Sequence, residues 1–182
     1  MSKKILIAYG TRYGATREAA EAMREALGAR GSEVNVVDLK QTMPANLSGY
    51  DGIIIGSSIQ AGQWMGEVKT FLIQNQQLWT AKKLAVYVSS STAITDAASA
   101  TDTYITKELD KLGITPAAAR AFPGVIDLSP KSRHGWLKKT ILSLIAKQQA
   151  KSSDGRLKLG EINDFRDWNA IKQFAIDFLS TL

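Results

Sequence analysis

The stretch that decides the fold is "AYGTRYGATREAA", residues 8–20. It completes a short apolar run, "KKILIAYG" (3–10), and leads into "TREAAEAMREALGARG" (16–31), which is rich in good helix formers. An apolar run of strand length, a turn with two glycines and an amphipathic segment predict a strand, a tight turn and a helix. A parallel β-α-β unit begins in this way.

Strand-like and helical segments alternate along the rest of the chain. Strands are expected at 33–39, 51–58, 83–91 and 117–128, and helices at 67–78, 101–113 and 167–182. Such alternation requires parallel strands joined by right-handed crossovers, with helices on both faces of the sheet. The sequence therefore predicts an α/β fold, a doubly wound five-stranded parallel sheet in one domain over 1–182. A basic segment at about 129–165, with one helix inside it, is expected as an insertion before the last helix.

Composition limits the chemistry that side chains alone can perform. The 182 residues contain no cysteine and one histidine, His134, which excludes disulfides and thiolate sites and argues against a protein-only metal site. No segment approaches the roughly 18 consecutive apolar residues of a membrane span and no secretory signal is visible, so a cytoplasmic location is expected. The net charge of +6 favours anionic partners, or simply solubility. Nucleic acid is not expected, because aromatic and basic residues are not interleaved as in RNA-binding modules.

Three predicted loops follow the carboxyl ends of strands, where doubly wound sheets bind ligands. They cover residues 10–16, 57–66 and 89–99, and all three are rich in Gly, Ser and Thr. The first loop opens directly onto a helix N-terminus, whose outward amides and dipole favour a phosphate. We therefore expect the ligand site at this edge of the sheet.

The first loop has the composition of a phosphate site. The hydroxyls of Thr11 and Thr16 can donate hydrogen bonds, Gly14 lets the backbone approach closely, and Arg12 either adds charge or faces solvent. The spacing matches neither a P-loop, which needs a lysine after the second glycine, nor the Gly-x-Gly-x-x-Gly dinucleotide motif. A loop for a terminal monophosphate remains. The alternative is an ordinary turn in which Thr11 or Thr16 caps the helix.

The motif "TRYGAT" (11–16) resembles the flavodoxin phosphate loop, Thr/Ser-x-Thr-Gly-x-Thr, with Tyr13 where the middle hydroxyl usually stands. Together with "YDGIIIGSSIQAGQWMGEVKTF" (50–71) and "DFRDWNAIKQFA" (164–175), it resembles the menaquinone-dependent protoporphyrinogen IX dehydrogenase family, a flavodoxin-like branch. The resemblance spans nearly the whole chain. It implies the flavodoxin strand order 2-1-3-4-5 and a bound flavin mononucleotide (FMN).

The resemblance also implies which residues hold FMN. The phosphate is expected at Thr11, Arg12, Tyr13, Gly14, Ala15 and Thr16. The ring system is expected against Ser57, Ser58, Ile59, Gln60, Ala61 and Gly62 on one edge, Ser89, Ser90 and Ser91 at the pyrimidine edge, and Trp64 over one face. Gly62 is expected to be the flexible point. The alternatives are a core or surface position for Trp64, and for the serines a role only in ending the strand.

The implied activity is oxidation of protoporphyrinogen IX with electrons passed to a quinone. The flavin would carry the chemistry, so no catalytic side chain is expected. One alternative is a flavodoxin that shuttles electrons between protein redox partners, although soluble flavodoxins are generally acidic and this chain is basic. Another is an NAD(P)H-linked or quinone-linked flavin reductase of the same fold.

The basic segment contains a pattern typical of an interfacial helix. Within 132–151, "SRHGWLKKTILSLIAKQQAK", Trp136, Leu137, Ile141, Leu144 and Ile145 recur at helical spacing, and the lysines lie mainly off that stripe. Such a helix can rest on an anionic membrane, or its cations can meet the propionates of a porphyrinogen. The alternative is a helix that packs its apolar side on the domain.

Overall fold

The computed structural model describes residues 2–129, 158 and 160–182, and these divide between two compact units. The first unit contains the chain up to Gly124 together with Arg166–Leu182, and the second contains Val125–Phe165. The second unit nearly coincides with the expected insertion at 129–165. The prediction of one domain over 1–182 stays a prediction. The expected helix within 132–151 and the residue His134 lie outside the described residues.

The first unit is built on a parallel sheet with the strand order β2-β1-β3-β5-β6. Its strands are β1 (Lys4–Gly10), β2 (Glu33–Asp38), β3 (Gly52–Gln60), β5 (Lys83–Ser90) and β6 (Ala118–Pro123). A short extra strand, β4 (Gln63–Trp64), pairs antiparallel with the end of β3. The expected doubly wound sheet and its order 2-1-3-4-5 are confirmed, with β5 and β6 as its fourth and fifth parallel strands.

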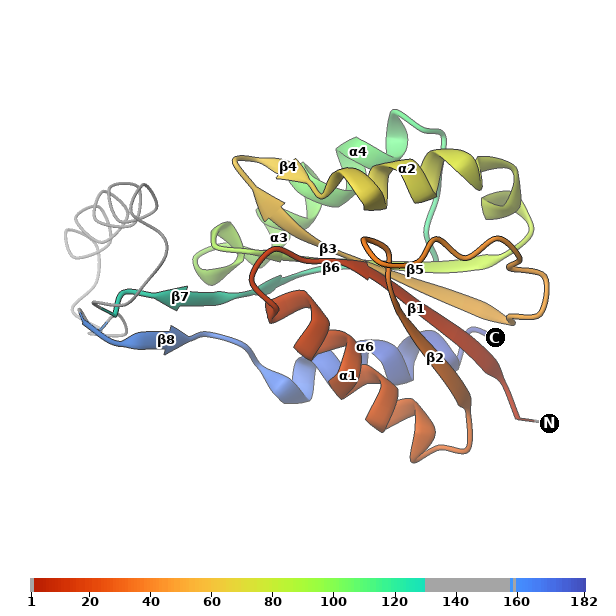
Figure 1. Cartoon of the computed structure of the whole chain (residues 1–182), viewed down its shortest axis with the longest axis horizontal. Coiled ribbons are helices and arrows are strands. Elements are labelled where there is room, and N and C mark those ends of the chain that lie inside the picture. Colours follow the sequence, from red (N-terminus) through yellow and green to blue (C-terminus); the bar gives the residue numbers. More distant parts are fainter. Residues whose placement is uncertain (1, 130–157, 159) are drawn as a thin grey trace. The chain divides into compact units, whose positions relative to one another are not determined.

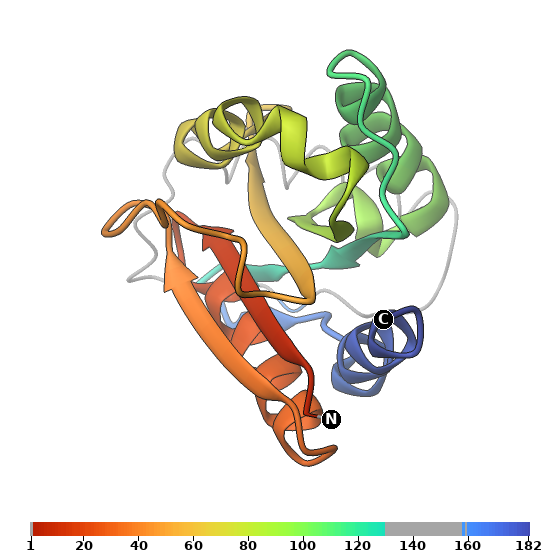
Figure 2. The same cartoon turned by 90° about the vertical axis from the view of Figure 1, so that its right-hand side faces the viewer.

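Helices cover both faces of this sheet (Figures 1 and 2). One face carries α1 (Ala15–Gly28) and α6 (Trp168–Leu179), which pack side by side. The other face carries α2 (Gly66–Gln74), the 3₁₀ turns η1 (Gln76–Thr80) and η2 (Thr92–Ile94), α3 (Ala97–Thr101), the π-helical turn η3 (Asp102–Thr106) and α4 (Lys107–Asp110). This two-sided cover is why the central strands read as continuous apolar runs.

Two hydrophobic clusters hold the layers together, one on each face. Successive side chains of a strand point to opposite faces, so Ile5 and Ile7 belong to the α1–α6 cluster while Leu6 and Ala8 belong to the α2–α4 cluster. On α6, Ile171, Phe174, Ala175 and Phe178 are buried, as the helical spacing predicts. The sheet is therefore held rigidly, and the ends of its strands are well-defined places for a site.

The predicted strand at 117–128 is wrong as a single element. The sheet strand β6 ends at Pro123, and β7 (Val125–Asp127) pairs antiparallel with β8 (Ile162–Asp164) in the second unit. Proline has no N–H to continue a ladder, which is consistent with the end of β6 at this residue. Within the second unit, the buried Asn163 side chain accepts from the backbone N–H of Lys158 and donates to that residue's carbonyl.

The predicted helix at 101–113 begins earlier and is less regular than expected. Asp96 caps it at its start, because its Oδ1 accepts from the backbone N–H of Ser99 at 2.8 Å. The α-helical segments α3 and α4 are joined by η3, and α4 ends at Asp110. Among the described helices, none combines the length and apolar character needed to cross a membrane.

Candidate functional site

The three predicted loops meet at one edge of the sheet. In the strand register, Gly10 of β1 lies opposite Ser57 of β3, and Ser58 lies opposite Ser89 of β5. The residues that follow β1, β3 and β5 therefore emerge side by side. We call this region, with the first turns of α1 and α2, the carboxyl edge.

Helix α1 begins at the carboxyl edge without a side-chain cap. Its N-cap is Gly14, with a left-handed φ of 96°, and among the described residues the helix has no side-chain cap hydrogen bond at this end. Thr11 serves the loop instead, because its Oγ1 accepts from the N–H of Gly14 at 3.0 Å. The alternative in which Thr11 or Thr16 caps the helix is thus not the arrangement found. The first-turn amides and the helix dipole remain directed at the loop.

Four buried polar atoms at the carboxyl edge have no hydrogen-bond partner among the described residues. They are Thr16 Oγ1 in the first turn of α1, Ser58 Oγ and Gln60 Oε1 at the end of β3, and Glu67 Oε1 in the first turn of α2. A buried polar group without a partner costs about 1–3 kcal/mol, so four such groups at one edge of the sheet call for an explanation. A polar ligand that donates to and accepts from these atoms supplies one.

The predicted loop 57–66 is a β-hairpin, so this prediction is corrected. Strand β3 continues to Gln60 and returns as β4 through a two-residue turn at Ala61 and Gly62, whose φ angles are 48° and 78°. Both turn residues are exposed. Left-handed backbone at two successive positions is typical of the tight turns that suit twisted hairpins. The turn at Gly62 remains the predicted flexible point.

The side chain of Ser57 stabilises the base of this hairpin through two hydrogen bonds. Its fully buried hydroxyl donates to the carbonyl of Ser58 at 3.1 Å and accepts from the backbone N–H of Met65 at 3.0 Å. The side chain of Ser57 therefore serves the protein's own backbone. Ser58, the next residue, points its unpartnered hydroxyl to the opposite side of the strand.

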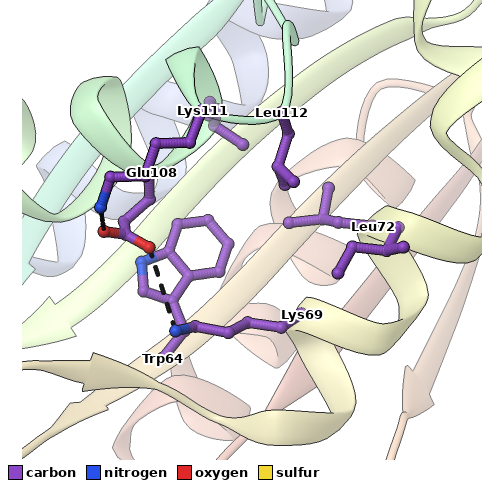
Figure 3. A pocket seen from close by; sticks show the side chains of 8 residues that line it. Trp64, Lys69, Leu72, Glu108, Lys111 and Leu112 are labelled. Carbon is purple, nitrogen blue, oxygen red and sulfur yellow. Dashed lines mark hydrogen bonds and ion pairs between the residues drawn. The ribbon is translucent and has the colours of Figure 1, made fainter.

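The position of Trp64 fits the core alternative. Its side chain is 6% exposed, and its indole N–H donates to the carbonyl of Tyr104. The ring lies at the floor of a hollow of about 120 Å³ between α2 and α4, where Leu72 and Leu112 also line the wall (Figure 3). The indole is therefore held in the cluster on the α2–α4 face of the sheet, opposite the face that carries α1.

The three serines of β5 have different environments. Ser89 and Ser90 are buried at the last two positions of the strand, whereas Ser91 is exposed. The Ser90 hydroxyl accepts from the backbone N–H of Thr92 at 3.1 Å and so begins the η2 turn. Ser90 thus fits the alternative in which the serines only end the strand.

Charged residues surround the loop at 10–16. Arg12 is exposed, with its guanidinium carbon 5.5 Å from the centre of the Tyr13 ring. Glu18 stands in the first turn of α1, and its Oε2 accepts from Nη1 of Arg166 at 2.6 Å. The sequence interpretation missed Glu18 and Arg166 as a pair, because 148 positions separate them along the chain and no local pattern relates them.

Tyr87, which the sequence interpretation also missed, lies on the sheet and contacts the first turn of α1. It is fully buried on β5, and its hydroxyl donates to the carbonyl of Thr16 at 2.9 Å. Burial raises the pKa of Tyr87 well above its ordinary value. Gly56 makes room for the ring, because a Cβ at that position would lie 2.2 Å from Tyr87 Cζ.

The comparisons with known proteins agree with this fold. The family model "Flavodoxin domain" matches residues 6–155. A protoporphyrinogen IX dehydrogenase [quinone] from Leishmania major is 23% identical over 180 residues, covering 97% of this chain and 75% of that protein. An NAD(P)H dehydrogenase (quinone) from Acidithiobacillus ferrooxidans is 32% identical over 117 residues, or 49% of this chain, and the match spans only 58% of that protein's length.

A solved structure extends the likeness to three dimensions. The flavodoxin of Fusobacterium nucleatum, a structure with bound flavin mononucleotide, superposes with a TM-score of 0.52 at 11% identity, covering 98% of this chain and 96% of that one. The chain belongs to the flavodoxin domain family. The predicted resemblance is therefore confirmed at the level of the family, and membership supports FMN as the cofactor.

Proposed function

We propose that the chain is an FMN-dependent oxidoreductase that binds its cofactor at the carboxyl edge. The observation that carries the proposal is the set of four buried polar atoms that lack partners among the described residues, on Thr16, Ser58, Gln60 and Glu67. FMN combines a terminal phosphate with a flat ring system whose edge both donates and accepts hydrogen bonds. It therefore suits a site of this mixed chemistry.

The phosphate would lie at the N-terminus of α1. The first amides of the helix are uncapped, and the Thr16 hydroxyl is buried beside them. A dianion accepts hydrogen bonds from such groups and is favoured by the helix dipole. Thr11, Arg12, Tyr13, Gly14 and Ala15 complete this cradle.

The ring system would lie between the hairpin turn and the end of β5. Ser58, Ile59, Gln60, Ala61 and Gly62 would border one edge, and Ser89, Ser90 and Ser91 would border the pyrimidine edge. Trp64, held in the core, and the side chain of Ser57 contribute support to the hairpin. When bound, FMN supplies two-electron transfer between a reduced substrate and an acceptor, while the chain's residues bind and orient it.

A quinone is the proposed electron acceptor, and protoporphyrinogen IX is the proposed substrate. Two relatives of different overall length are both described as quinone-dependent dehydrogenases, which supports the acceptor. The porphyrinogen rests on the motifs at 11–20, 50–71 and 164–175 and on the relative from Leishmania major. The described residues contain no cluster of three or more side chains suited to a metal ion.

Anaerobic oxidation of protoporphyrinogen IX tests this function directly. The FMN-loaded protein with a menaquinone analogue should produce protoporphyrin IX fluorescence, and flavin-free protein or a reaction without the analogue should not. The flavin itself is checked by the visible spectrum and by release of FMN on denaturation. A yellow protein that leaves the porphyrinogen unoxidised would contradict the substrate while retaining the cofactor.

An electron carrier is the second candidate, because the fold likeness to a flavodoxin covers both chains almost entirely. The net charge of +6 opposes this role unless the partner is acidic. Rapid reduction by a flavodoxin reductase, together with inactivity toward porphyrinogen and quinone, would favour the carrier.

Contact with an anionic membrane through 132–151 would give the protein access to a membrane-dissolved quinone at the cytoplasmic side. These residues lie outside the described part of the chain, so this proposal rests on their sequence pattern. Flotation with anionic liposomes should recover the intact protein and leave a form without 132–151 behind. Equal recovery of the two forms would contradict the proposal.

A further inference from the structure

Helix α1 carries an acidic residue where the proposed function requires an anion to bind. Glu18 stands in its first turn, and its Oε1 lies 3.7 Å from the position that a Cβ on Gly14 would take. Carboxylates and phosphates are both favoured at the positive end of a helix. A bare Glu18 would therefore compete with a phosphate for this end and repel it.

Arg166 holds this carboxylate. Its Nη1 donates to Glu18 Oε2 at 2.6 Å, and its guanidinium carbon lies 4.3 Å from the centre of the Trp168 ring. The side chain of Arg166 is only 8% exposed, whereas that of Glu18 is 50% exposed. Stacking on Trp168 and burial thus hold the guanidinium of Arg166 in place, and its ion pair holds the exposed carboxylate of Glu18.

The backbone that presents Arg166 is also fixed. The next residue, Asp167, caps α6, because its Oδ1 accepts from the N–H of Ala170 at 3.0 Å. Helix α6 packs beside α1, so the segment just before it reaches the first turn of α1. The location of Arg166 is therefore a consequence of how α6 begins.

We propose that Arg166 is a positioning residue for phosphate binding: it neutralises Glu18 and holds its carboxylate so that α1 can accept a phosphate dianion. The inference rests on the proposed function. It predicts a phosphate-specific effect, since the charge of Glu18 acts on the phosphate of FMN far more strongly than on the neutral ring of riboflavin. The nearby Arg17, whose Nη2 lies 3.8 Å from the Gly14 Cβ position, leaves the surroundings positive once Glu18 is paired.

Binding of FMN and of riboflavin to the flavin-free protein tests the inference. The Kd values are measured by quenching of flavin fluorescence for the wild type, Arg166→Met, Glu18→Gln and the double variant. Arg24→Met is the matched control, because Arg24 pairs with Glu21 at 2.7 Å on the same helix, farther from the loop. Circular dichroism checks that every variant is folded.

Arg166→Met should weaken FMN binding about tenfold, which is about 1.4 kcal/mol, and change riboflavin binding less than about twofold. Glu18→Gln should bind FMN at least as well as the wild type, and the double variant should recover to within about threefold of it. Arg24→Met should bind both flavins normally. If Arg166→Met does not fold, the comparison of Arg166→Lys with Glu18→Gln/Arg166→Lys replaces it, with a smaller loss and the same recovery.

Two results would overturn the inference. One is that Arg166→Met weakens the binding of FMN and of riboflavin equally, which would mean that Arg166 has only a structural role. The other is a double variant that binds FMN as weakly as Arg166→Met. Wild-type protein that binds riboflavin as tightly as FMN would instead contradict the phosphate cradle of the proposed function, and the inference with it. Failure of the inference alone therefore has a distinct pattern, in which the wild type prefers FMN and the double variant does not recover.

Discussion

The two ends of the same sheet differ in how their polar groups are used. At the amino edge, where β1 and β3 begin, the backbone N–H of Lys4 donates to Asp51 Oδ2 at 2.7 Å, and Lys4 Nζ pairs with Glu33 at 2.9 Å. Lys3 Nζ donates to the carbonyl of Leu182 at 2.8 Å. At the carboxyl edge, four buried polar atoms lack partners among the described residues.

This difference predicts which substitutions change stability and which change ligand binding. The amino edge satisfies its own groups, so changes there should alter the free energy of unfolding and leave ligand affinity alone. The carboxyl edge keeps donors and acceptors unpaired at a cost of about 1–3 kcal/mol each, and a ligand that pairs with them recovers that cost. Substitutions that remove one of these four unpaired groups should alter affinity and leave the flavin-free protein as stable as before, or more stable.

Thr16→Val is the largest test of this contrast. Valine keeps the shape of threonine and removes the unpartnered hydroxyl, so the flavin-free protein should be unchanged or up to about 1 kcal/mol more stable. FMN affinity should fall about tenfold to hundredfold, the range of a hydrogen bond to a charged group, as measured by fluorescence titration. Thr70→Val, on the exposed side of α2, is the matched control. Lower stability with unaltered affinity would reverse the assignment.

Gly52→Ala tests the amino edge. The added Cβ would lie 2.8 Å from Leu182 Cδ1 and 2.9 Å from Phe178 Cε1, so these two side chains must shift. Denaturant unfolding should reveal a loss of about 1–2 kcal/mol, with the Kd for FMN unchanged. Gly49→Ala, where no atom lies within 4 Å, is the control. A weaker Kd for FMN in the folded Gly52→Ala protein would mean that the two edges are coupled.

Tyr87→Phe has the smallest expected effect at neutral pH, about 1 kcal/mol, because it removes the hydrogen bond to the Thr16 carbonyl. Its pH dependence is more specific. Burial raises the pKa of Tyr87 in the folded state, so the unfolded chain ionises first as pH rises through the ordinary value of 10.0. Stability is therefore retained below pH 10 and lost above it, by up to about 1.4 kcal/mol per pH unit for this tyrosine.

Unfolding measured between pH 8 and pH 12 should give a shallower alkaline loss for Tyr87→Phe than for the wild type. Some loss should persist, because burial also raises the pKa of Tyr9, as does the nearby charge of Asp38. Equal slopes in the two proteins would mean that Tyr87 is not buried in the way described.

Local sequence patterns predicted the structure correctly wherever it depended on a single helix or strand. The run "KILIAY" and the helical spacing of Ala19, Met23 and Leu27 predicted β1 and α1, and the apolar run 53–55 predicted a strand buried on both faces. The predictions failed where a strand's partner was decisive. Residues 117–128 divide between two sheets, and the end of β3 turns back as a hairpin, because pairing with β8 and β4 is invisible in those segments alone.

By itself, the sequence determined the alternation of strands and helices, the parallel sheet and the glycine-threonine turn at the start of α1. These are consequences of periodicity and of local backbone preference, which short segments carry within themselves. Only the tertiary structure decided that Trp64 is buried against Tyr104, that Tyr87 supports Thr16 and that Arg166 meets Glu18. Such contacts join residues 40, 71 and 148 positions apart, and they exist only once packed layers bring those residues together.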